Sequence, residues 1–294
     1  MFFIKIMNIF ENKRVFTGNV QTDRIICLSL DDKDVILLSL TCKYFYEKVF
    51  SENFWLLKVS RNKKWLEIKS LVKDMKFKDF YFAMRRKKSN IFPKTGDAGE
   101  ETEGWIVDKS TKLTEYDFIL GQFMYRMMIN KFGTGNHREL TLDKSFTLIK
   151  WMGKNSLKFL RNMMDGNIPK DGECISRLNF IEETWESTYV AYFMTFEVMS
   201  EMINSMDKDV YMVRLSSTIS GSITLQYRGH GTINFANRVK VDETGKFKMV
   251  DKIWETLETL DASFIDMLRR KYNKHFRSMF EGEPLEYGKY ISYY

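Results

Sequence analysis

The sequence predicts a multidomain α+β protein: helical segments come first, and an antiparallel sheet flanked by two helices follows. Before Asp207, apolar residues recur every three or four positions, which is typical of helices. Residues 93–104, PKTGDAGEETEG, contain no large apolar side chain and are expected to form a linker. Beyond Asp207, apolar and polar residues alternate, as in half-buried strands. With 294 residues, 44% of them hydrophobic, the chain can form two or three packed domains.

The N-terminal third has the pattern of short amphipathic helices. Asp31, Asp32 and Asp34 precede an apolar run, and negative charge is favoured at a helix N-terminus. The apolar residues that follow repeat every three to four positions: Val35, Leu38, Cys42, Phe45 and Val49. A segment of roughly 40 residues can hardly bury so much apolar surface alone. We therefore expect the surface of another protein to complete it.

This stretch resembles an F-box. The matching parts are DRIICLSL at residues 23–30, KDVILLSLTCKYF at residues 33–45 and Phe54–Trp55, against the family runs I-L-S-x-L, K-D-L-x-x-L-x-x-V-C-K-x-F and L-W. The resemblance implies an F-box over residues 20–62 that binds a Skp-type adaptor, which bridges to a cullin-RING ligase. The residues expected to contact the adaptor are Ile25, Ile26, Leu28, Leu30, Leu37 and Trp55. The proline that usually precedes the first helix is missing, so an ordinary all-helical domain is the alternative.

Residues 63–92 are expected to be a helical extension of this domain, and the N-terminal third is basic. Residues 1–92 contain 19 Lys and Arg against 10 Asp and Glu, whereas the rest of the chain contains 27 against 29. The densest cluster is residues 85–88, RRKK. No aromatic-interleaved nucleic-acid motif accompanies it, so we interpret it as a solvated helix end and expect no nucleic-acid partner.

The segment 105–188 is predicted to be helical, with helices around residues 116–131, 141–152 and 155–164. After it, the expected order is a helix, three strands and a helix. The first helix begins after Thr195 as N-cap and has one apolar face: Phe196, Met199, Ile203 and Met206. The last helix repeats Ile253, Leu257, Leu260, Phe264 and Leu268.

The strands between these helices show period-two alternation. Ile223, Leu225 and Tyr227 alternate with Ser222, Thr224, Gln226 and Arg228. Residues 229–231, GHG, supply a turn, and the next strand continues with Ile233, Phe235, Val239 and Val241. The pattern predicts an antiparallel meander.

An arginine lies inside the first of these strands, VYMVRL at residues 210–215. Both faces of this strand are largely apolar, so we expect it to be central in the sheet. A charge buried there without an anion costs several kcal/mol, roughly. No acidic residue follows until Asp242, and hydroxyl groups come first: Ser216, Ser217, Thr218 and Ser220. A guanidinium, hydroxyls and turn amides together form a suitable cradle for a phosphate.

The stretch DVYMVRLSS at residues 209–217 resembles the G-T-F-L-V-R-x-S strand of Src homology 2 domains. GKF at residues 245–247 and WETLETL at residues 254–260 are similar to the later G-G-F and F-x-T-L-x-x-L segments. The resemblance implies such a domain over residues 189–275, with a tail at 276–294, and recognition of phosphotyrosine. It assigns the phosphate to Arg214, hydroxyl donors to Ser216, Ser217 and Thr218, and contact with the phosphotyrosine ring to Arg238.

The sequence departs from that family at several positions. The glycine before the arginine strand is missing, Ala236 stands where histidine is common, and Phe196 occupies a position that often carries a second arginine. The alternative is that Arg214 is a relic paired internally. YVAYFMTFEV at residues 189–198 resembles the G-Y-M-A-F-L-T-Y-D-E-V run of the divergent Src homology 2 domain of Cbl ubiquitin ligases, which also lacks this second arginine.

Residues 113–133 and 174–182 are similar to the paired EF-hand segment that precedes that domain in Cbl proteins, and the helical linker of STAT proteins has a comparable shape. A calcium loop needs oxygen ligands at positions 1, 3 and 5 and a Glu at 12. The two possible alignments give Ile168, Lys170, Gly172 and Asn179, or Gly135, His137, Glu139 and Phe146. We therefore expect no calcium, and a structural helical segment that braces the phosphate-binding domain.

The sequence gives no reason to expect catalysis, a cofactor or a metal site. No nucleotide-binding glycine loop occurs, and the three histidines and three cysteines lack metal-ligand spacing. No apolar run of about 18 residues is present, so we expect no membrane span and a cytoplasmic, or also nuclear, protein.

These patterns lead to one functional hypothesis and two alternatives. We expect a non-catalytic substrate receptor of a Skp-cullin-F-box ubiquitin ligase that captures a tyrosine-phosphorylated protein. The first alternative is a phosphotyrosine-binding signalling adaptor or STAT-like regulator with no ubiquitin-ligase link. The second is a receptor whose pocket binds an unphosphorylated or acidic segment.

Overall fold

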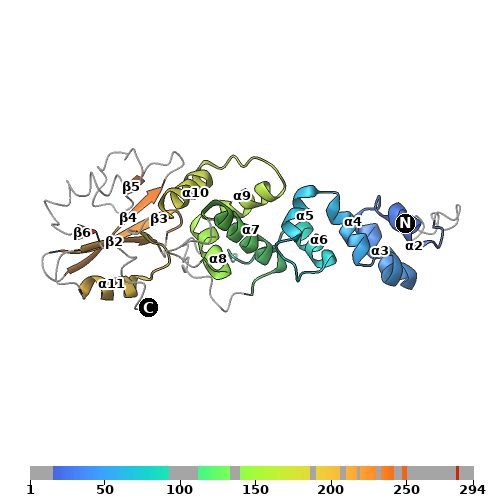
Figure 1. The fold of residues 1–294 in the computed structure, drawn as a ribbon, viewed down its shortest axis with the longest axis horizontal. Helices are drawn as coiled ribbons and strands as arrows, with labels where there is room; N and C mark the ends of the chain where they lie inside the picture. The colour runs from blue at the N-terminus through green and yellow to red at the C-terminus, as the bar shows by residue number, and fades with distance from the viewer. Residues whose placement is uncertain are drawn as a thin grey trace, which may run out of the picture. The chain divides into compact units, whose positions relative to one another are not determined.

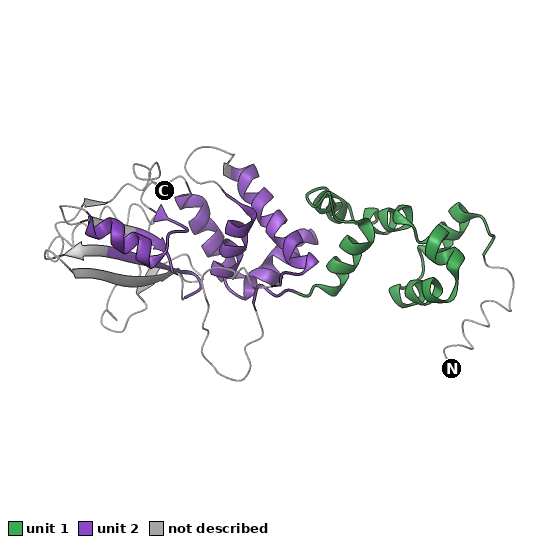
Figure 2. Cartoon of the chain, turned by 90° about the horizontal axis from the view of Figure 1, so that it is seen from below, with its two compact units in different colours: residues 1–88 green, residues 89–294 purple. Residues whose placement is uncertain are grey.

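The computed structural model describes residues 16–92, 112–132, 140–185, 190–205, 210–216, 219–229, 233–241, 247–249 and 283–284. The chain divides into two compact units, residues 1–88 (unit 1) and 89–294 (unit 2) (Figure 2). Within the described ranges the architecture is α+β: helices predominate, and every strand belongs to the C-terminal part of unit 2 (Figure 1). In those ranges no helix combines the length and apolarity needed to cross a membrane.

Unit 1 is helical. Its elements are α2 (Val20–Cys27), α3 (Asp32–Thr41), a π-helical turn η1 (Phe45–Val49), α4 (Glu52–Ser60), α5 (Lys63–Lys69) and α6 (Phe77–Arg86). The acidic start of α3 is as predicted, because the Asp31 side chain accepts the Asp34 amide as N-cap. Four members of the predicted apolar repeat are buried, namely Val35, Leu38, Phe45 and Val49, whereas Cys42 ends α3 as its C-cap and is only partly buried.

Aromatic packing and hydrogen bonding to the Asp32 carboxylate stabilise unit 1. The rings of Phe50 and Phe54 lie 4.8 Å apart, and those of Trp55 and Tyr81 lie 5.4 Å apart, which joins α4 to α6. The Tyr81 hydroxyl donates to Asp32 Oδ1 at 2.6 Å. Helix α6 is therefore fixed to the start of α3, and the extension forms one compact unit with the helices before it.

Unit 2 begins with four helices: α7 (Glu115–Phe132), α8 (Leu142–Trp151), α9 (Asn155–Met164) and α10 (Gly172–Thr184). The first three match the predicted helices to within one residue at each end. Gly121 lets α7 approach α8 closely, because a Cβ atom there would lie 2.4 Å from Cε1 of Phe146. Asp117 is fully buried and accepts hydrogen bonds from Ser89, Asn90 and Thr114, which secures the start of α7.

The sheet follows the four helices. Its strands are β1 (Val190–Ala191), β2 (Val210–Leu215), β3 (Ser222–Gly229), β4 (Ile233–Val241), β5 (Phe247–Met249) and β6 (Glu283–Pro284), and helix α11 (Phe196–Asn204) lies between β1 and β2. The order is β1-β2-β3-β4-β5, with β6 also pairing with β2. Strands β2, β3 and β4 are antiparallel, whereas β1 runs parallel to β2. The predicted meander and the central position of β2 are confirmed.

The two faces of the sheet differ in polarity. On one face Val213, Leu215, Ile223 and Leu225 are buried. Helix α11 covers the other face (Figure 1), where Nε2 of Gln226 donates to Oγ of Ser200 at 2.6 Å. The helix expected over residues 253–268 lies outside the described residues. Of the turn predicted at residues 229–231, Gly229 is the last residue of β3, and the other two residues lie outside the described ranges.

Asp23 of α2 is a buried carboxylate with a shifted pKa. It accepts hydrogen bonds from the Thr17 amide at 2.7 Å, the Gly18 amide at 3.0 Å and the Tyr44 hydroxyl at 2.7 Å. Burial alone would raise the pKa, but the hydrogen bonds outweigh it, so the pKa lies below its ordinary value of 3.8. A depressed pKa in the folded state stabilises unit 1 above about pH 4, and this stabilisation is lost as the pH falls further.

We predict that Asp23→Asn lowers the free energy of unfolding of unit 1 by about 2 kcal/mol at pH 7, because buried donors lose an ionised acceptor. The difference from wild type should shrink between pH 4 and pH 2, as Asp23 in the wild-type protein becomes protonated. Native-state hydrogen exchange of the α2 amides measures both effects.

The matched control for this prediction is Asp74→Asn, because Asp74 is exposed. It should stay within about 0.5 kcal/mol of wild type at both pH values. A destabilisation by Asp23→Asn that is equal at pH 7 and at pH 2 contradicts the role given to the Asp23 charge.

Candidate functional site

Arg214 lies on β2 beneath the start of α11. Its side chain is 4% exposed, Nη1 donates to the Leu215 carbonyl at 3.1 Å, and Cζ lies 5.8 Å from the centre of the Phe196 ring. Thr195 is the N-cap of α11, as predicted, and accepts the Val198 amide at 3.3 Å. This cap makes Phe196 the first residue of the helix.

Phe196 departs from its predicted location on the buried face of α11. Met199 and Ile203 are fully buried as expected, whereas Phe196 remains 41% exposed. Met206, the fourth residue of the predicted face, lies outside the described residues. In the first turn of the helix, the Phe196 ring extends over the guanidinium of Arg214 instead of into the core. Arg214 thus has an aromatic neighbour on the face of the sheet that α11 covers.

The strand register places Arg214 in one row with polar residues of the neighbouring strands. Arg214 pairs with Ala191 of β1 and Thr224 of β3, and Thr224 pairs with Arg238 of β4. Thr224 is 2% exposed. Since neighbouring strands are about 4.8 Å apart, the backbone of Arg238 lies roughly 10 Å from that of Arg214. Thr224 was not among the predicted site residues. The available signal was its position on the polar face of its strand, which it shares with Gln226 and Arg228.

The β2–β3 connection carries the predicted hydroxyl groups. Ser216 is 3% exposed, and its hydroxyl accepts the Ile219 amide at 3.2 Å. Its own amide donates to the Ser222 carbonyl at 2.8 Å, which closes the turn. Ser217 and Thr218 lie outside the described residues. Ser216 therefore lies two residues from Arg214, at the start of a hydrogen-bonded turn.

The N-terminal helices expose apolar side chains. Ile25 is 68% exposed, in agreement with a surface position, and Ile26, Leu28, Leu30 and Leu37 are partly exposed. The sequence did not single out Leu40, which is 78% exposed, or Ile36 and Tyr46, which are also exposed. These three apolar residues lie between the positions of the apolar repeat. An apolar residue outside that repeat was the signal in the sequence for an exposed apolar side chain. We call Ile25, Ile36, Leu40 and Tyr46 the apolar surface of unit 1.

Trp55 is part of the core and not of this surface. It is 3% exposed, packs on Phe54 and Tyr81, and its Nε1 donates to the Phe50 carbonyl at 3.0 Å. The packing of α6 against α4 covers the indole, and this contact could not be seen from the local pattern. Trp55 therefore joins α4 to α6 in the core of unit 1.

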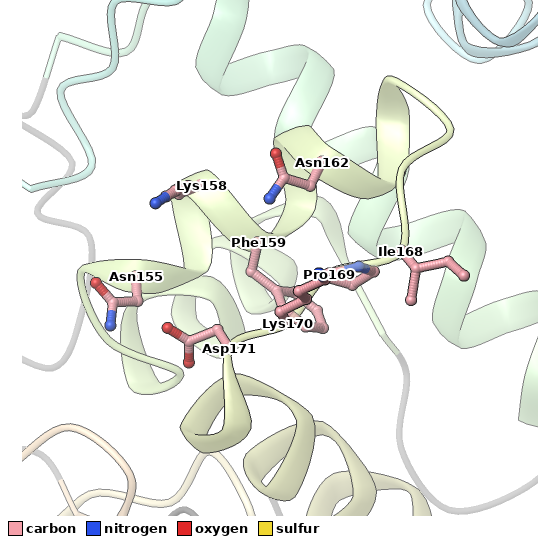
Figure 3. A pocket seen from close by; sticks show the side chains of 8 residues that line it. All are labelled: Asn155, Lys158, Phe159, Asn162, Ile168, Pro169, Lys170 and Asp171. Atoms are coloured by element: carbon pink, nitrogen blue, oxygen red, sulfur yellow. The ribbon is translucent and has the colours of Figure 1, made fainter.

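A pocket of ≈ 370 Å³ lies between α9 and the loop that leads to α10 (Figure 3). Its lining is Asn155, Lys158, Phe159, Asn162, Ile168, Pro169, Lys170 and Asp171. This is the loop compared above with a calcium site. Lys158 and Lys170 place positive charge beside it, and the Asp171 carboxylate is engaged as N-cap of α10 through the Cys174 amide. With two lysines and a single carboxylate, this lining is a poor match for a calcium ion, which takes about six to eight oxygen ligands.

The described residues contain no group of three or more His, Cys, Asp or Glu side chains that could hold a metal ion. The three cysteines are free. Burial raises the pKa values of the Cys27 and Cys174 thiols to about 12, so both are protonated at neutral pH. Neither thiol is suited to act as a nucleophile.

Comparison of the chain with models of known protein families and with curated protein sequences returns no match.

We predict that Trp55→Ala destabilises unit 1 by about 3–5 kcal/mol, because it leaves a large cavity in the aromatic core. Leu40→Ala should change the stability by less than about 0.5 kcal/mol, since Leu40 is exposed. Native-state hydrogen exchange of the α4 amides distinguishes the two variants. A neutral Trp55→Ala would mean that the indole belongs to the surface after all.

Proposed function

We propose that the chain is a substrate-recognition subunit of a Skp-cullin-F-box type ubiquitin ligase. In this proposal unit 2 binds a tyrosine-phosphorylated protein through Arg214, and unit 1 binds a Skp-type adaptor that leads to the cullin-RING ligase. The chain itself is non-catalytic and brings the target to the ligase. The observation that carries the proposal is the cross-strand row of Arg214, Thr224 and Arg238 beside α11.

The position of Arg214 favours a phosphate on a long side chain. A buried guanidinium is costly to desolvate, and a phosphate dianion compensates this cost with two parallel hydrogen bonds to the planar fork. Because Arg214 is only 4% exposed, the phosphate must reach inward from the surface. Phosphotyrosine reaches further from its backbone than phosphoserine does. The partly exposed Phe196 offers an apolar contact for the ring of the same side chain.

Ser216 and the register position of Arg238 support this arrangement. Ser216 begins the turn that follows Arg214, and serine hydroxyls and turn amides are suitable donors to phosphate oxygens. Arg238 occupies the register position beyond Thr224, which agrees with the proposed contact with the phosphotyrosine ring. Ser217 and Thr218 keep their role as phosphate donors in the proposal.

The apolar surface of unit 1 supports the adaptor half of the proposal. Isolated exposed apolar residues are ordinary, but here Ile25, Ile36, Leu40 and Tyr46 come from three consecutive short helical elements. A helical protein partner would remove them from water. The resemblance of this stretch to an F-box suggests that the partner is a Skp-type adaptor.

We predict that Arg214→Ala weakens binding of a phosphotyrosine peptide about 30-fold or more, because truncating one partner of a buried charge pair costs about 2–5 kcal/mol. The measurement is titration calorimetry of the full chain with a phosphotyrosine peptide library. Arg161→Ala is the control, since Arg161 is exposed and pairs with Asp165 of its own helical segment. Equal binding of the dephosphorylated peptide would favour a receptor for an acidic or unphosphorylated segment.

We also predict that Ile25→Glu abolishes co-purification of a Skp-type adaptor with the full chain, because it buries a carboxylate in an apolar interface. The matched control is Ile168→Glu, since Ile168 of unit 2 is 87% exposed. Recovery of no adaptor with the wild-type chain would favour a phosphotyrosine-binding adaptor without a ubiquitin-ligase link.

A further inference from the structure

The far end of the β2–β3 connection is hydrogen-bonded to the end of α8. The Gly221 amide donates to the Trp151 carbonyl at 2.7 Å, and Nε1 of Trp151 donates to the Ser222 carbonyl at 2.6 Å. The Ser222 carbonyl also accepts the Ser216 amide at 2.8 Å. One carbonyl oxygen thus joins the start of the connection, its end and the middle helices.

Arg177 of α10 interlocks with the same turn. Its side chain is 3% exposed, Nη1 donates to the Met152 carbonyl at 2.7 Å, and Nη2 lies 2.9 Å from Oε2 of Glu173. The guanidinium lies directly against Gly221, where a Cβ atom would be 2.0 Å from Nε. On the other side is Gly153, where a Cβ atom would be 2.8 Å from Nη1.

Both glycines have positive φ angles, +69° at Gly221 and +93° at Gly153, which disfavour a residue with a side chain. The two turns therefore close on Arg177 with no room for an added methyl group. The α8–α9 turn, α10 and the β2–β3 connection consequently form one packed arrangement, which we call the Arg177 clasp.

We infer that Trp151 and Arg177 are positioning residues: they hold Gly221 and Ser222, and through the Ser222 carbonyl the Ser216 amide, in the arrangement that receives the phosphate. The inference rests on the proposed function. Trp151 acts through the Ser222 carbonyl, which accepts hydrogen bonds from both Trp151 Nε1 and the Ser216 amide. Without the Trp151 hydrogen bond this carbonyl is held less firmly, and the Ser216 amide is held less firmly with it. Arg177 acts by filling the space beside Gly221, so a shift of α10 moves the turn.

The first test is Trp151→Phe in the full chain, which keeps an aromatic ring and removes the donor to Ser222. Amide hydrogen exchange at Ser216 should become about tenfold faster, and the affinity for a phosphotyrosine peptide should fall about fivefold, as expected for the loss of one hydrogen bond. Circular dichroism checks that the variant is folded.

The second test is Gly221→Ala, which forces a methyl group into the guanidinium of Arg177. Gly18→Ala is the matched control, because Gly18 also has a positive φ, +77°, and nothing lies within 4 Å of its added Cβ atom. Gly221→Ala should weaken peptide binding about tenfold, and Gly18→Ala should leave it unchanged. Adding Arg177→Ala to Gly221→Ala makes room for the methyl group and should restore part of the lost affinity.

The outcomes separate this inference from the proposed function. If the wild-type chain shows no phosphopeptide binding that depends on Arg214, the proposed function fails, and the positioning role fails with it. If that binding is present but Trp151→Phe changes neither Ser216 exchange nor affinity, the inference alone is overturned. Should Gly221→Ala not fold, Trp151→Phe decides. An absence of rescue in the double variant, together with unchanged peptide binding by Arg177→Ala alone, contradicts the role of Arg177.

Discussion

The guanidinium of Arg214 is a positive charge in the interior of a β-sheet, and the surrounding elements are arranged to accommodate it. The antiparallel register sets Thr224 beside it, the N-cap at Thr195 begins α11 so that Phe196 lies over it, and the turn after β2 begins with Ser216. Such a site is costly to desolvate and therefore favours an anion that can form several hydrogen bonds. This constraint connects the local sequence of β2 with the proposed recognition of phosphotyrosine.

The two units differ in the chemistry of the features on which the proposed function depends. Unit 1 is built on an aromatic core in which Trp55 and Tyr81 join α4 to α6, and it exposes the apolar surface on α2, α3 and η1. Unit 2 presents buried polar groups beside α11, and the Arg177 clasp ties this part to the middle helices. An apolar surface suits a lasting protein partner, whereas a charged site suits a ligand controlled by phosphorylation. This division is compatible with the substrate receptor proposed above.

Regular periodicity explains which parts of the fold could be predicted from the sequence. Helices α7 to α9 and strands β2 to β4 have long, uniform repeats, and Thr195 is a recognisable cap. Strand β1 has two residues and depends on a distant parallel pairing, so no local pattern reveals it. The burial of Trp55 and the interlocking of Arg177 with Gly221 arise from contacts between residues far apart in the sequence. The predicted Arg214 and Ser216 come together on β2 and its turn, whereas the contribution of Thr224 appears only from the register.

The central claim is that Arg214 binds phosphate, and its most direct test is the ¹H–¹⁵N signal of the Arg214 Nε–H group during titration of the full chain with phenyl phosphate. The signal is assigned by its loss in Arg214→Lys. A saturable downfield shift of this signal is predicted, because the Nε–H group and a phosphate oxygen form a charge-assisted hydrogen bond. A signal that stays unmoved at saturating phenyl phosphate, or that moves equally with benzyl alcohol, would contradict phosphate recognition by Arg214.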